Sequence, residues 1–548
     1  MIDAVIRRAT RSVAGWDRWT RLTAVVLAVL ALYVLAVFLD YGVTWDEAET
    51  ADNGRLALAW FTSLGRDDRV ITVLQHRLFG SAFNLAGAAA SAVSPLGRFE
   101  TIHLLTAALG WTALLYTARL GSSVGGSRAG FFAMLTLALT PPFVGHAFMN
   151  PKDIPLAAFF VAGAFYMVRA FGELPMPAGT TLRRFAVATG LAASTRVIGA
   201  FLLIYWAFAI GIWWLGAVAA RRPRPRWTTV AGWWWKPALG AWLLMVACWP
   251  YAQLDPIRNP VRALLDLSRF TDFPAGVQFE GARISSNNLP WTYLPTWFSI
   301  SLPELYLTAL AAGIVPGIAF LVYEGRGRRW RAVVCTGFLL LAALAPPVLA
   351  TWRHAVMYDG MRHFLFVLPF LAVLAGCALS AGWGDLMALG ARRSVWTVFR
   401  ALLAVVPVTA SLASAGLTAA DLYALHPYEY VYFNRLVAGG QAAASKRFET
   451  DYWGLSYKEG LEWLRDHYPT DAGPVTVSNC SADFLTEYMI RNDPQLAARL
   501  RPLSQHALPP PRILLATTRY DCHRRPGYRV LHVVTRQDAP LMYVLERE

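Results

Sequence analysis

Two acidic residues, Asp46 and Glu47, follow closely on a nearly charge-free apolar run at 22–39. One interpretation is that they begin a helix on the membrane surface, where acids favour the first turn. Thr44 would then cap that helix, and Glu47, three residues on, would complete a capping box. The other interpretation is that the chain needs a carboxylate at the membrane surface to take a proton from a reacting group.

A second polar group lies in "NPKDIP", where Asn150, Lys152 and Asp153 stand between two prolines. Taken alone, the stretch predicts a tight turn in which Pro151 shapes the entry and Asp153 caps the next helix. Lys152 would add a cation at the same membrane face as Asp46, provided the two loops lie on one side.

Two more stretches carry charge at or inside apolar segments. "YDGMRHFLF" puts Asp359, Arg362 and His363 at the mouth of a late span, where Arg and His can also simply extend to the interface. Arg196, in "ASTRVIGA", falls within a predicted span, where a cation requires an anionic partner or a wet cavity. Together these groups would supply carboxylates for proton abstraction and cations for a phosphate.

The elements that must position these residues are membrane helices. The chain has 548 residues, of which 56% are apolar and 16% charged, and long apolar runs recur along most of it. This composition predicts a polytopic α-helical membrane protein. We expect about eleven transmembrane helices, near 21–39, 99–118, 127–145, 154–171, 184–201, 203–220, 237–254, 298–322, 331–351, 363–387 and 397–419. The pair 184–201 and 203–220 is tight and could be re-entrant. The apolar but small-residue-rich segment 78–95 could lie on the membrane or partly in it.

Basic residues set the orientation. The N-terminus, the stretch "RRPRPRW", the stretch "EGRGRRWR" and the stretch "ARRSVW" are all basic, and with eleven spans they fall on one side. The positive-inside rule makes that side cytoplasmic, with the N-terminus. The net charge of +15 is explained in the same way, in preference to nucleic-acid binding. The polar clusters above then gather on the opposite face.

The composition divides the chain into three parts. Residues 1–420 form the membrane domain, with external loops at 40–98 and 255–296. Residues 421–455 form an aromatic connector. Residues 456–548 predict a small soluble α/β domain outside the membrane, with helices at 456–467 and 492–500 and strands at 474–479, 512–518, 528–535 and 541–546.

The chain has five cysteines. Three fall in predicted spans and read as packing residues. Cys480 and Cys522 fall in the soluble domain, near the ends of two predicted strands, and could pair in an oxidising compartment. The sequence alone leaves open whether their Cα atoms are close enough.

The order of these motifs resembles a known superfamily. "TWDE" after the first span, "NPKDIP", "YDGMRHFLFVLP" and the long stretch "HPYEYVYFNRLVAGG…FETDYWGLSYKEGLEWL" are similar to bacterial membrane glycosyltransferases of the GT-C superfamily. More narrowly, they resemble glycosyltransferase family 39, which includes the dolichyl-phosphate-mannose protein mannosyltransferases, and the related aminoarabinose transferases of lipid A. The resemblance covers about residues 20–480, most of the chain.

The resemblance implies a GT-C fold in the bacterial inner membrane. It implies a reaction on the periplasmic face that takes a sugar from a polyprenyl phosphate. Asp46 matches the family's general base, and Glu47 matches the neighbour that orients the acceptor or the base. Lys152 and Asp153 match the loop that helps form the donor site. Direct displacement would invert the anomeric centre, with Lys152, Arg362, His363 and Arg196 as candidates for binding the donor phosphate and with Asn150, Asp153 and Asp359 in support.

The loop 270–298 resembles the acceptor-side or lid loop of the superfamily. Its Phe273, Trp291, Tyr293 and Trp297 could stack on a sugar, or equally could anchor the loop at the interface. The chain lacks the soluble repeats that eukaryotic protein mannosyltransferases insert between spans, which weakens the case for a protein acceptor. The acceptor therefore stays open among a lipid, a glycan and a protein.

The metal dependence also stays open. Some members of the superfamily use a divalent cation such as Mg²⁺ or Mn²⁺, and Asp46 and Asp153 could share one. Basic side chains could neutralise the phosphate instead, and we expect this arrangement and no dedicated metal site. No His-Cys cluster indicates zinc, and no glycine-rich phosphate loop indicates a nucleotide-sugar donor.

Two other functions are compatible with the same fold. A transporter or flippase of a polyprenyl-linked glycan would carry its essential polar groups along a path near the membrane midplane. A non-catalytic assembly subunit would retain the fold without needing Asp46. The placement of charge at the external ends of spans favours the enzyme.

Overall fold

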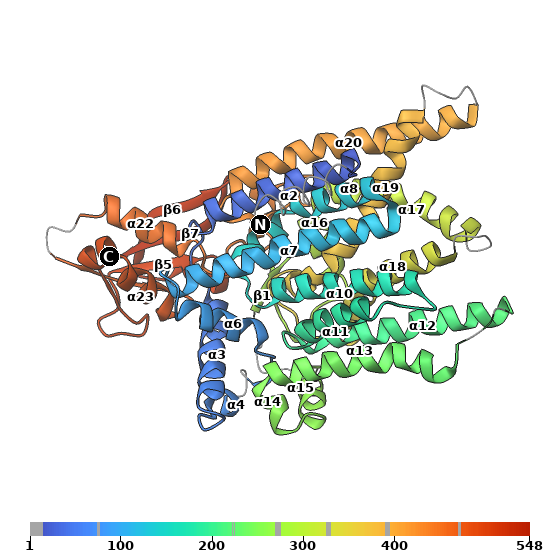
Figure 1. The fold of residues 1–548 in the computed structure, drawn as a ribbon. Coiled ribbons are helices and arrows are strands. Elements are labelled where there is room, and N and C mark those ends of the chain that lie inside the picture. Colours follow the sequence, from blue (N-terminus) through green and yellow to red (C-terminus); the bar gives the residue numbers. More distant parts are fainter. Residues whose placement is uncertain are drawn as a thin grey trace, which may run out of the picture.

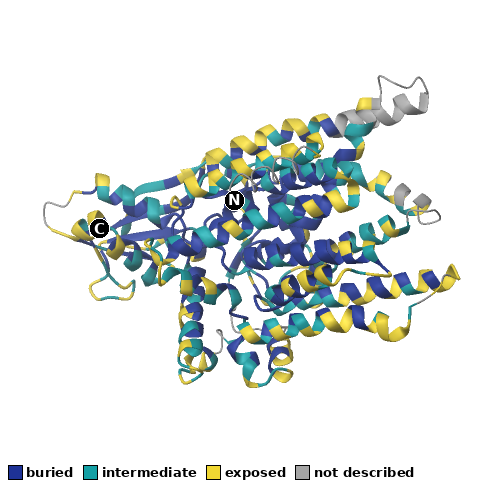
Figure 2. Ribbon diagram, viewed as in Figure 1, coloured by how far each residue is buried: buried dark blue, intermediate teal, exposed yellow. Residues whose placement is uncertain are grey.

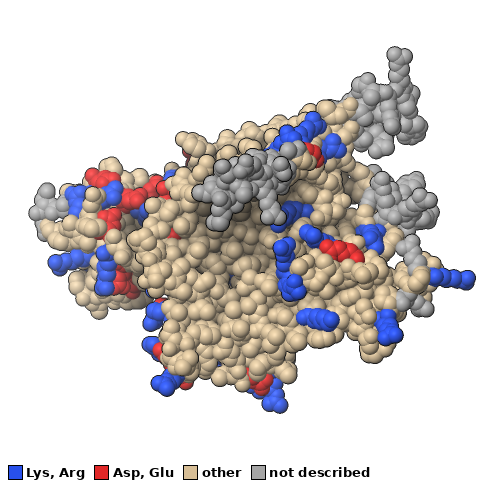
Figure 3. Space-filling view, in the orientation of Figure 1, with Lys and Arg blue, Asp and Glu red and all other residues tan. Residues whose placement is uncertain are grey.

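The computed structural model describes residues 15–548, apart from 74–76, 222, 224, 269–275, 325–329, 389–394 and 470–472. Long helices run side by side in a bundle, and a smaller unit of strands and short helices packs on one end of it (Figure 1). A broad uncharged band separates this charged unit from the Lys and Arg side chains of the opposite end (Figure 3). Such a band is what lipid contact requires.

Helices occupy all eleven positions that the sequence predicts. They are α2 (Arg18–Val37), α7 (Arg98–Gly125), α8 (Ser127–Ala138) with α9 (Pro141–Met149), α10 (Asp153–Glu173), α11 (Gly179–Ala193), η1 (Val197–Ala200) with α12 (Phe201–Ala219), α13 (Trp227–Cys248), α16 (Tyr293–Ser301) with α17 (Glu304–Glu324), α18 (Trp330–Trp352), η2 (Arg362–Val367) with α19 (Leu368–Ala388), and α20 (Val395–Leu425).

Fewer than eleven of these helices are long and apolar enough to span a membrane on their own. Among the described residues seven meet that requirement, and two bent pairs raise the number to nine. The polytopic helical class is confirmed, but the expected count of eleven is too high by this measure. The two helices left out are α11, which has only 15 residues, and α13, which contains Lys236 and Pro237.

Bends in the bundle occur where the sequence interrupts a helix. The axes of α8 and α9 differ by 69° and those of α16 and α17 by 111°. Pro141 begins α9 at the first helical position, where its missing N–H costs nothing. The bend directs α9 toward the turn that carries Lys152.

The predicted span 184–201 is broken, which corrects the expectation for Arg196. Helix α11 ends at Ala193, and Arg196 has extended backbone angles before η1 begins at Val197. Arg196 therefore lies in an irregular break between two helices, and not inside a helix crossing lipid. The apolar segment 78–95 contains only the ten-residue helix α6 (Ala82–Ser91), which is too short to span.

Short elements cover the end of the bundle that carries the polar clusters. Helix α3 (Trp45–Thr62) runs across this end beside the tail unit (Figure 1). The remaining elements of the loops are α4 (Arg69–Thr72), α14 (Pro250–Leu254), α15 (Arg258–Ser268), and the hairpin of β1 (Gly276–Phe279) and β2 (Ala282–Ser285).

The tail is a small α/β unit with a mixed five-stranded sheet in the order β4-β3-β5-β7-β6. Strand β3 pairs in parallel with β4 and β5, and β7 pairs antiparallel with β5 and β6. Gln537 and Asp538, both at positive φ, form the tight turn between β6 and β7. The elements are η3 (Glu429–Val431), α21 (Gln441–Ala444), α22 (Tyr457–His467), β3 (Val475–Asn479), α23 (Asp483–Asn492), α24 (Pro494–Arg499), β4 (Leu500–Pro502), β5 (Ile513–Thr517), η4 (Arg519–Arg524), β6 (Tyr528–Arg536) and β7 (Ala539–Arg547).

The tail and the membrane helices share one hydrophobic core. Phe160 of α10, Trp453 of the connector and Leu515 of β5 belong to the same contiguous cluster of buried side chains. Buried residues continue from the bundle into the tail without an exposed layer between them (Figure 2). The tail is therefore docked on the helical bundle, and the end of the bundle beneath it is shielded from water.

Candidate functional site

The carboxylate of Asp46 is held between two cations. Its Oδ1 lies 3.4 Å from Nζ of Lys152, and its Oδ2 accepts a hydrogen bond of 3.1 Å from a guanidinium nitrogen of Arg362. Asp46 is 6% exposed. Three segments distant in the sequence thus converge: the start of α3, the turn before α10, and the turn that leads into η2.

Electrostatics keep this carboxylate ionised. Burial alone would raise the pKa of Asp46, but the charges of Lys152, Arg362 and Arg196 outweigh burial and hold its pKa below the usual value. For Lys152, burial favours the neutral amine, whereas Asp46 and Glu49 favour the ammonium and raise its pKa overall. Both groups therefore carry their charges at neutral pH.

A second carboxylate of α3 also binds Lys152. Nζ of Lys152 donates to Oε2 of Glu49 at 2.9 Å. Residues three apart on a helix lie on one face, so Asp46 and Glu49 both point to the same ammonium. Glu49 is absent from the residues predicted above, although this spacing offered a signal for it.

Arg362 links Asp46 to the next carboxylate, that of Asp153. The same guanidinium nitrogen of Arg362 lies 3.6 Å from Oδ2 of Asp153. Oδ1 of Asp153 lies 2.7 Å from a nitrogen of Arg196. Arg196 thus has the anionic partner that its position requires, at the end of the bundle and not at its middle.

On its other side Arg362 is fixed by Asp359 and, through it, by the tail. Nε of Arg362 lies 3.1 Å from Oδ2 of Asp359, and the indole N–H of Trp453 donates to the same oxygen at 2.9 Å. Arg519, from η4 of the tail, donates to Oδ1 of Asp359 at 2.7 Å. Arg519 also donates to the carbonyl of Tyr452 at 2.8 Å. No sequence signal marked Arg519, because only the docking of the tail brings it here.

The turn at 150–153 is preorganised by Asn150. Its Oδ1 accepts from the backbone N–H groups of Lys152, at 3.2 Å, and of Asp153, at 2.9 Å. Its Nδ2 donates to Oδ2 of Asp153 at 2.9 Å. Asn150, and not Asp153, therefore satisfies the backbone N–H groups at the start of α10.

Gly145 allows α9 to approach the connector closely enough to place this turn. A Cβ at Gly145 would lie 2.4 Å from the backbone nitrogen of Tyr430. Any side chain at this position would push α9 and the turn after it away from the connector.

Glu47 has the capping role of the first interpretation given above. Its Oε2 accepts from the backbone N–H of Thr44, at 2.7 Å, and from the Thr44 hydroxyl, at 3.0 Å. Its Oε1 lies 2.7 Å from Nε2 of His103 on α7. Glu47 is fully buried. These contacts fix the first turn of α3 and thereby the position of Asp46.

A small pocket opens beside this network. Lys152 and Arg196 supply its cationic wall, and both lie over the ring of Phe79, at 5.9 and 5.6 Å. The pocket is lined by Glu49, Thr50, Asn53, Phe79, Asn84, Pro151, Lys152, Thr195 and Arg196. A group with several negatively charged oxygens is the complement of such a wall.

Other predicted residues are not brought to this pocket. His363 packs edge-on against Tyr358, with 5.1 Å between ring centroids, and does not line the pocket. Trp291 is 72% exposed, whereas Tyr293 and Trp297 are buried in an aromatic cluster with Phe279 and Phe448. Phe273 lies outside the described residues. The aromatic residues of the loop 270–298 are therefore divided between the surface, where Trp291 lies, and the core, where Tyr293 and Trp297 lie.

Cys480 and Cys522 are joined in a disulfide, with 6.3 Å between their Cα atoms. The bond ties the end of β3 to η4, the element that carries Arg519. The disulfide therefore constrains the position of η4, through which the tail contacts Asp359.

The carboxylates of this network pair with cationic side chains. Within the part of the chain that the structure describes, no three His, Cys, Asp or Glu side chains are grouped to hold one. Asp46 and Asp153, the pair that the sequence offered, are bridged by the guanidinium of Arg362.

Solved structures similar to this chain include three transferases. The apo crystal structure of the Archaeoglobus fulgidus oligosaccharyltransferase is 14% identical, with a TM-score of 0.49, over 87% of this chain and 64% of that chain. The apo crystal structure of ArnT from Cupriavidus metallidurans is 15% identical, with a TM-score of 0.44, over 95% of this chain and 97% of that chain. The arabinofuranosyltransferase AftD from Mycobacteria is 15% identical, with a TM-score of 0.39, over 95% of this chain and 41% of that chain.

This chain thus spans just under two thirds of the length of the oligosaccharyltransferase. The similar structures are those of glycosyltransferases of the GT-C superfamily, the superfamily that the motifs resemble. No family model and no curated protein matches the chain. Because the identities are near 15% and the TM-scores are below 0.5, we assign no family on this basis and argue the function from the site.

Proposed function

We propose that this chain is a membrane glycosyltransferase that moves a sugar from a polyprenyl phosphate to a hydroxyl group of a cell-envelope acceptor. The observation that carries the proposal is the buried carboxylate of Asp46, which contacts Lys152 beside a pocket whose wall is Lys152 and Arg196. The ammonium group of Lys152 thus contacts the proposed base, Asp46, and also lines the proposed phosphate pocket. The motif resemblance described above supports the same reaction.

Asp46 is the general base in this proposal. As the acceptor oxygen bonds to the anomeric carbon, its proton becomes acidic and passes to the Asp46 carboxylate. A pKa below the usual value keeps Asp46 ionised, which a base requires before it reacts. Direct attack by the acceptor inverts the anomeric centre.

Lys152 and Arg196 hold the phosphate that leaves. A phosphate departs without being protonated, so the step needs cations and no second acid. Glu49 and Asp153 neutralise the two cations in the absence of substrate. A bound phosphate would compete with these carboxylates for the two cations.

The reaction would take place on the periplasmic side of the bacterial inner membrane, with the N-terminus in the cytoplasm. The positive-inside pattern of the loops supports this orientation. A flippase is the alternative, and it would need charged groups along the middles of helices. The ion pairs of this network instead join the start of α3, two turns and the tail. That distribution favours the enzyme.

The test is mass spectrometry of envelope glycoconjugates from cells with and without the gene. We expect one glycoconjugate to lose a sugar in the deletion strain and to regain it with the wild-type gene. Asp46→Asn should fail to restore it. Asp52→Asn should restore it, because Asp52 lies on the same helix but is exposed and pairs with Arg55 at the surface.

The variants also separate the alternatives. A non-catalytic subunit predicts that Asp46→Asn restores the sugar as well as the wild type does. A flippase predicts that the missing sugar is accompanied by a lipid-linked glycan that accumulates on the cytoplasmic face. Either result would reject the transferase.

A further inference from the structure

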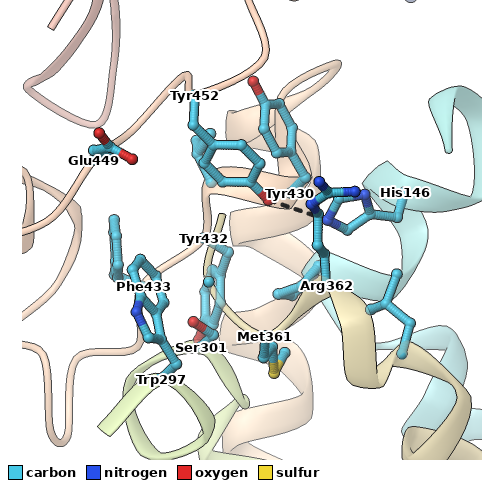
Figure 4. A pocket seen from close by; sticks show the side chains of 14 residues that line it. His146, Trp297, Ser301, Met361, Arg362, Tyr430, Tyr432, Phe433, Glu449 and Tyr452 are labelled. Carbon is cyan, nitrogen blue, oxygen red and sulfur yellow. Dashed lines mark hydrogen bonds between the residues drawn. The ribbon is translucent and has the colours of Figure 1, made fainter. Parts of the chain in front are cut away.

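The hollow between Arg362 and the aromatic connector is too small for a further ligand. Figure 4 shows Arg362 and His146 on one side of it and Glu449 and Trp297 on the other. Its volume is about 10 Å³, which is room for about one water. A further binding site therefore needs a larger space.

A groove of that larger kind runs along α12 and α13, which lie side by side and extend to the end of the bundle away from the tail (Figure 1). It has room for about 510 Å³. Nine residues line it and none of them is polar; they include Trp214 of α12 and Trp227 and Trp234 of α13. Trp227 is 74% exposed, so the groove opens outward, where lipid surrounds the bundle.

The space between the two helices is left open by a glycine. Trp206 donates to the carbonyl of Trp233 at 2.8 Å, and Trp234 donates to that of Leu203 at 3.0 Å. These bonds join the helices at one level. Nearer the turn, Gly211 lines the groove, and a Cβ at this position would meet nothing within 4 Å. The chain thus leaves a space that an ordinary apolar side chain could fill.

The turn between the helices places positive charge at one end of the groove. Trp227, the first residue of α13, lines the groove, and Arg226 directly precedes it. Arg221 follows the end of α12 by two residues. Both arginines are exposed, and within the part of the chain that the structure describes neither guanidinium has an ion-pair or hydrogen-bond partner. Arg331, at the same end of the bundle, instead donates to two backbone carbonyls.

We propose that this groove binds an anionic phospholipid, with an acyl chain along the tryptophans and the phosphate at Arg226 and Arg221. Guanidinium groups form charge-assisted hydrogen bonds with phosphate oxygens. Basic pockets between membrane helices bind the headgroups of anionic lipids. Tryptophan suits the boundary between the two parts, because its ring packs on acyl chains and its N–H faces the headgroups. This site is additional to the proposed sugar transfer and does not depend on it.

The position of the groove separates this lipid from the donor of the proposed reaction. The donor phosphate is assigned to Lys152 and Arg196, and Arg196 precedes α12. Arg221 and Arg226 follow α12, whose 19 residues make a helix about 28 Å long. One phosphate cannot reach both ends of that helix. The charge at the turn therefore calls for a second lipid.

The first test measures the preference for charge by native mass spectrometry of the purified full-length protein. The probes are phosphatidylglycerol, which is anionic, and phosphatidylethanolamine, which is zwitterionic. We expect the wild type to retain phosphatidylglycerol more tightly. Arg221→Gln and Arg226→Gln should each lower that retention about fivefold and leave phosphatidylethanolamine unchanged, because each removes one cation from the headgroup. Arg183→Gln, at an exposed arginine of α11 that does not line the groove, is the control.

The second test fills the groove. Gly211→Leu places a side chain in the space of the acyl chain and should remove most of the retained lipid of either kind. Gly216→Leu is the matched control, since it makes the same substitution on the same helix. A Cβ at Gly216 also meets nothing within 4 Å, but Gly216 does not line the groove. This control should retain lipid as the wild type does.

Each contrary result overturns the proposal. Equal retention of the two lipids by the wild type, or arginine variants that behave like Arg183→Gln, would mean that the turn selects no anionic headgroup. If Gly211→Leu retains lipid as well as Gly216→Leu does, the lipid lies outside the groove. If a photoreactive polyprenyl phosphate labels Trp214 or Trp227, the occupant is the chain of the donor and not a phospholipid.

Discussion

At the scale of single residues, Asp46 is set by two cations that arrive from different loops. Lys152 and Arg362 approach its two oxygens at 3.4 and 3.1 Å. We predict that Asp46→Asn lowers the rate of sugar transfer by about 10²–10⁴-fold, the usual range for loss of a general base. Binding of polyprenyl phosphate should not weaken, because the variant removes a negative charge beside the phosphate pocket. If donor binding does weaken, Asp46 helps to bind the donor before the reaction begins.

For Lys152 and Arg196 we predict weaker binding of the donor, in contrast to Asp46→Asn, for which donor binding should not weaken. Lys152→Met and Arg196→Met remove cations from the wall of the pocket. We predict that each weakens capture of polyprenyl phosphate about tenfold, because each loses a charge-assisted contact to phosphate. Arg169→Met, a surface arginine paired with Glu173, is the control. Unchanged capture in both pocket variants would locate the phosphate elsewhere.

Glu449 predicts a pH dependence of stability. Its pKa is about 7 in the folded protein, against an unperturbed value of 4.5. A raised acid pKa costs nothing below pH 4.5, and its penalty grows with pH until it is complete above about 7, at about 3 kcal/mol. Arg519, Asp359, Arg283 and the N–H of Gln278 face this carboxylate.

The measurement is the melting temperature of wild type and Glu449→Gln between pH 4.5 and 8. The other titrating groups are common to both proteins, so the difference between the two curves isolates Glu449. We expect Glu449→Gln to gain relative stability as the pH rises. Parallel curves would mean that Glu449 ionises as freely in the folded protein as in the unfolded one.

At the scale of elements, η4 of the tail stabilises a turn of the membrane domain. Arg519 of η4 and Arg362 of η2 share the carboxylate of Asp359. We predict that Arg519→Met destabilises the protein by up to about 3 kcal/mol, because a buried carboxylate loses one of its cations. The transfer rate should fall as well, since Arg362 is then less firmly placed against Asp46.

A double-mutant cycle with Asp359→Asn measures this coupling. If the two side chains act through each other, the double variant should be more stable than the sum of the single losses predicts. Additive losses would show that Arg519 stabilises the tail alone, through the carbonyl of Tyr452. Melting of the full-length protein provides the values.

The sequence predicted the positions of elements better than their interruptions. Apolar runs located helices at all eleven sites, and β-branched alternation located four of the strands of the tail sheet. The break at Arg196 was missed, although the polar residues Ser194, Thr195 and Arg196 interrupt the apolar run there. The sequence predicted Asp46, Lys152 and Arg362 as site residues because charge beside an apolar run is conspicuous, and the structure brings these three together. Arg519 and Glu449 lie in polar segments, where a charge is not conspicuous, and only tertiary packing identifies them.

At the scale of the whole molecule, the tail is bound to the bundle by a shared core and closed by a disulfide. Cys480 and Cys522 are 42 residues apart in sequence. A loop of that size corresponds to about 4 kcal/mol of chain entropy in the unfolded state. We predict that replacing both cysteines by serine lowers the melting temperature of the full-length protein and lowers the transfer rate with it, because η4 carries Arg519. If the variant is as stable as the wild type but inactive, the disulfide is needed for the position of η4 and not for overall stability.

The position of Arg519 in the chain has a consequence for biosynthesis. It follows every membrane helix in the sequence, yet it contacts Asp359, which is coupled through Arg362 to Asp46 near the start of the chain. A nascent protein therefore inserts all of its helices before it can complete the charge network. Under the proposed function, the newly made protein should therefore remain catalytically silent until the tail has docked and Arg519 has reached Asp359.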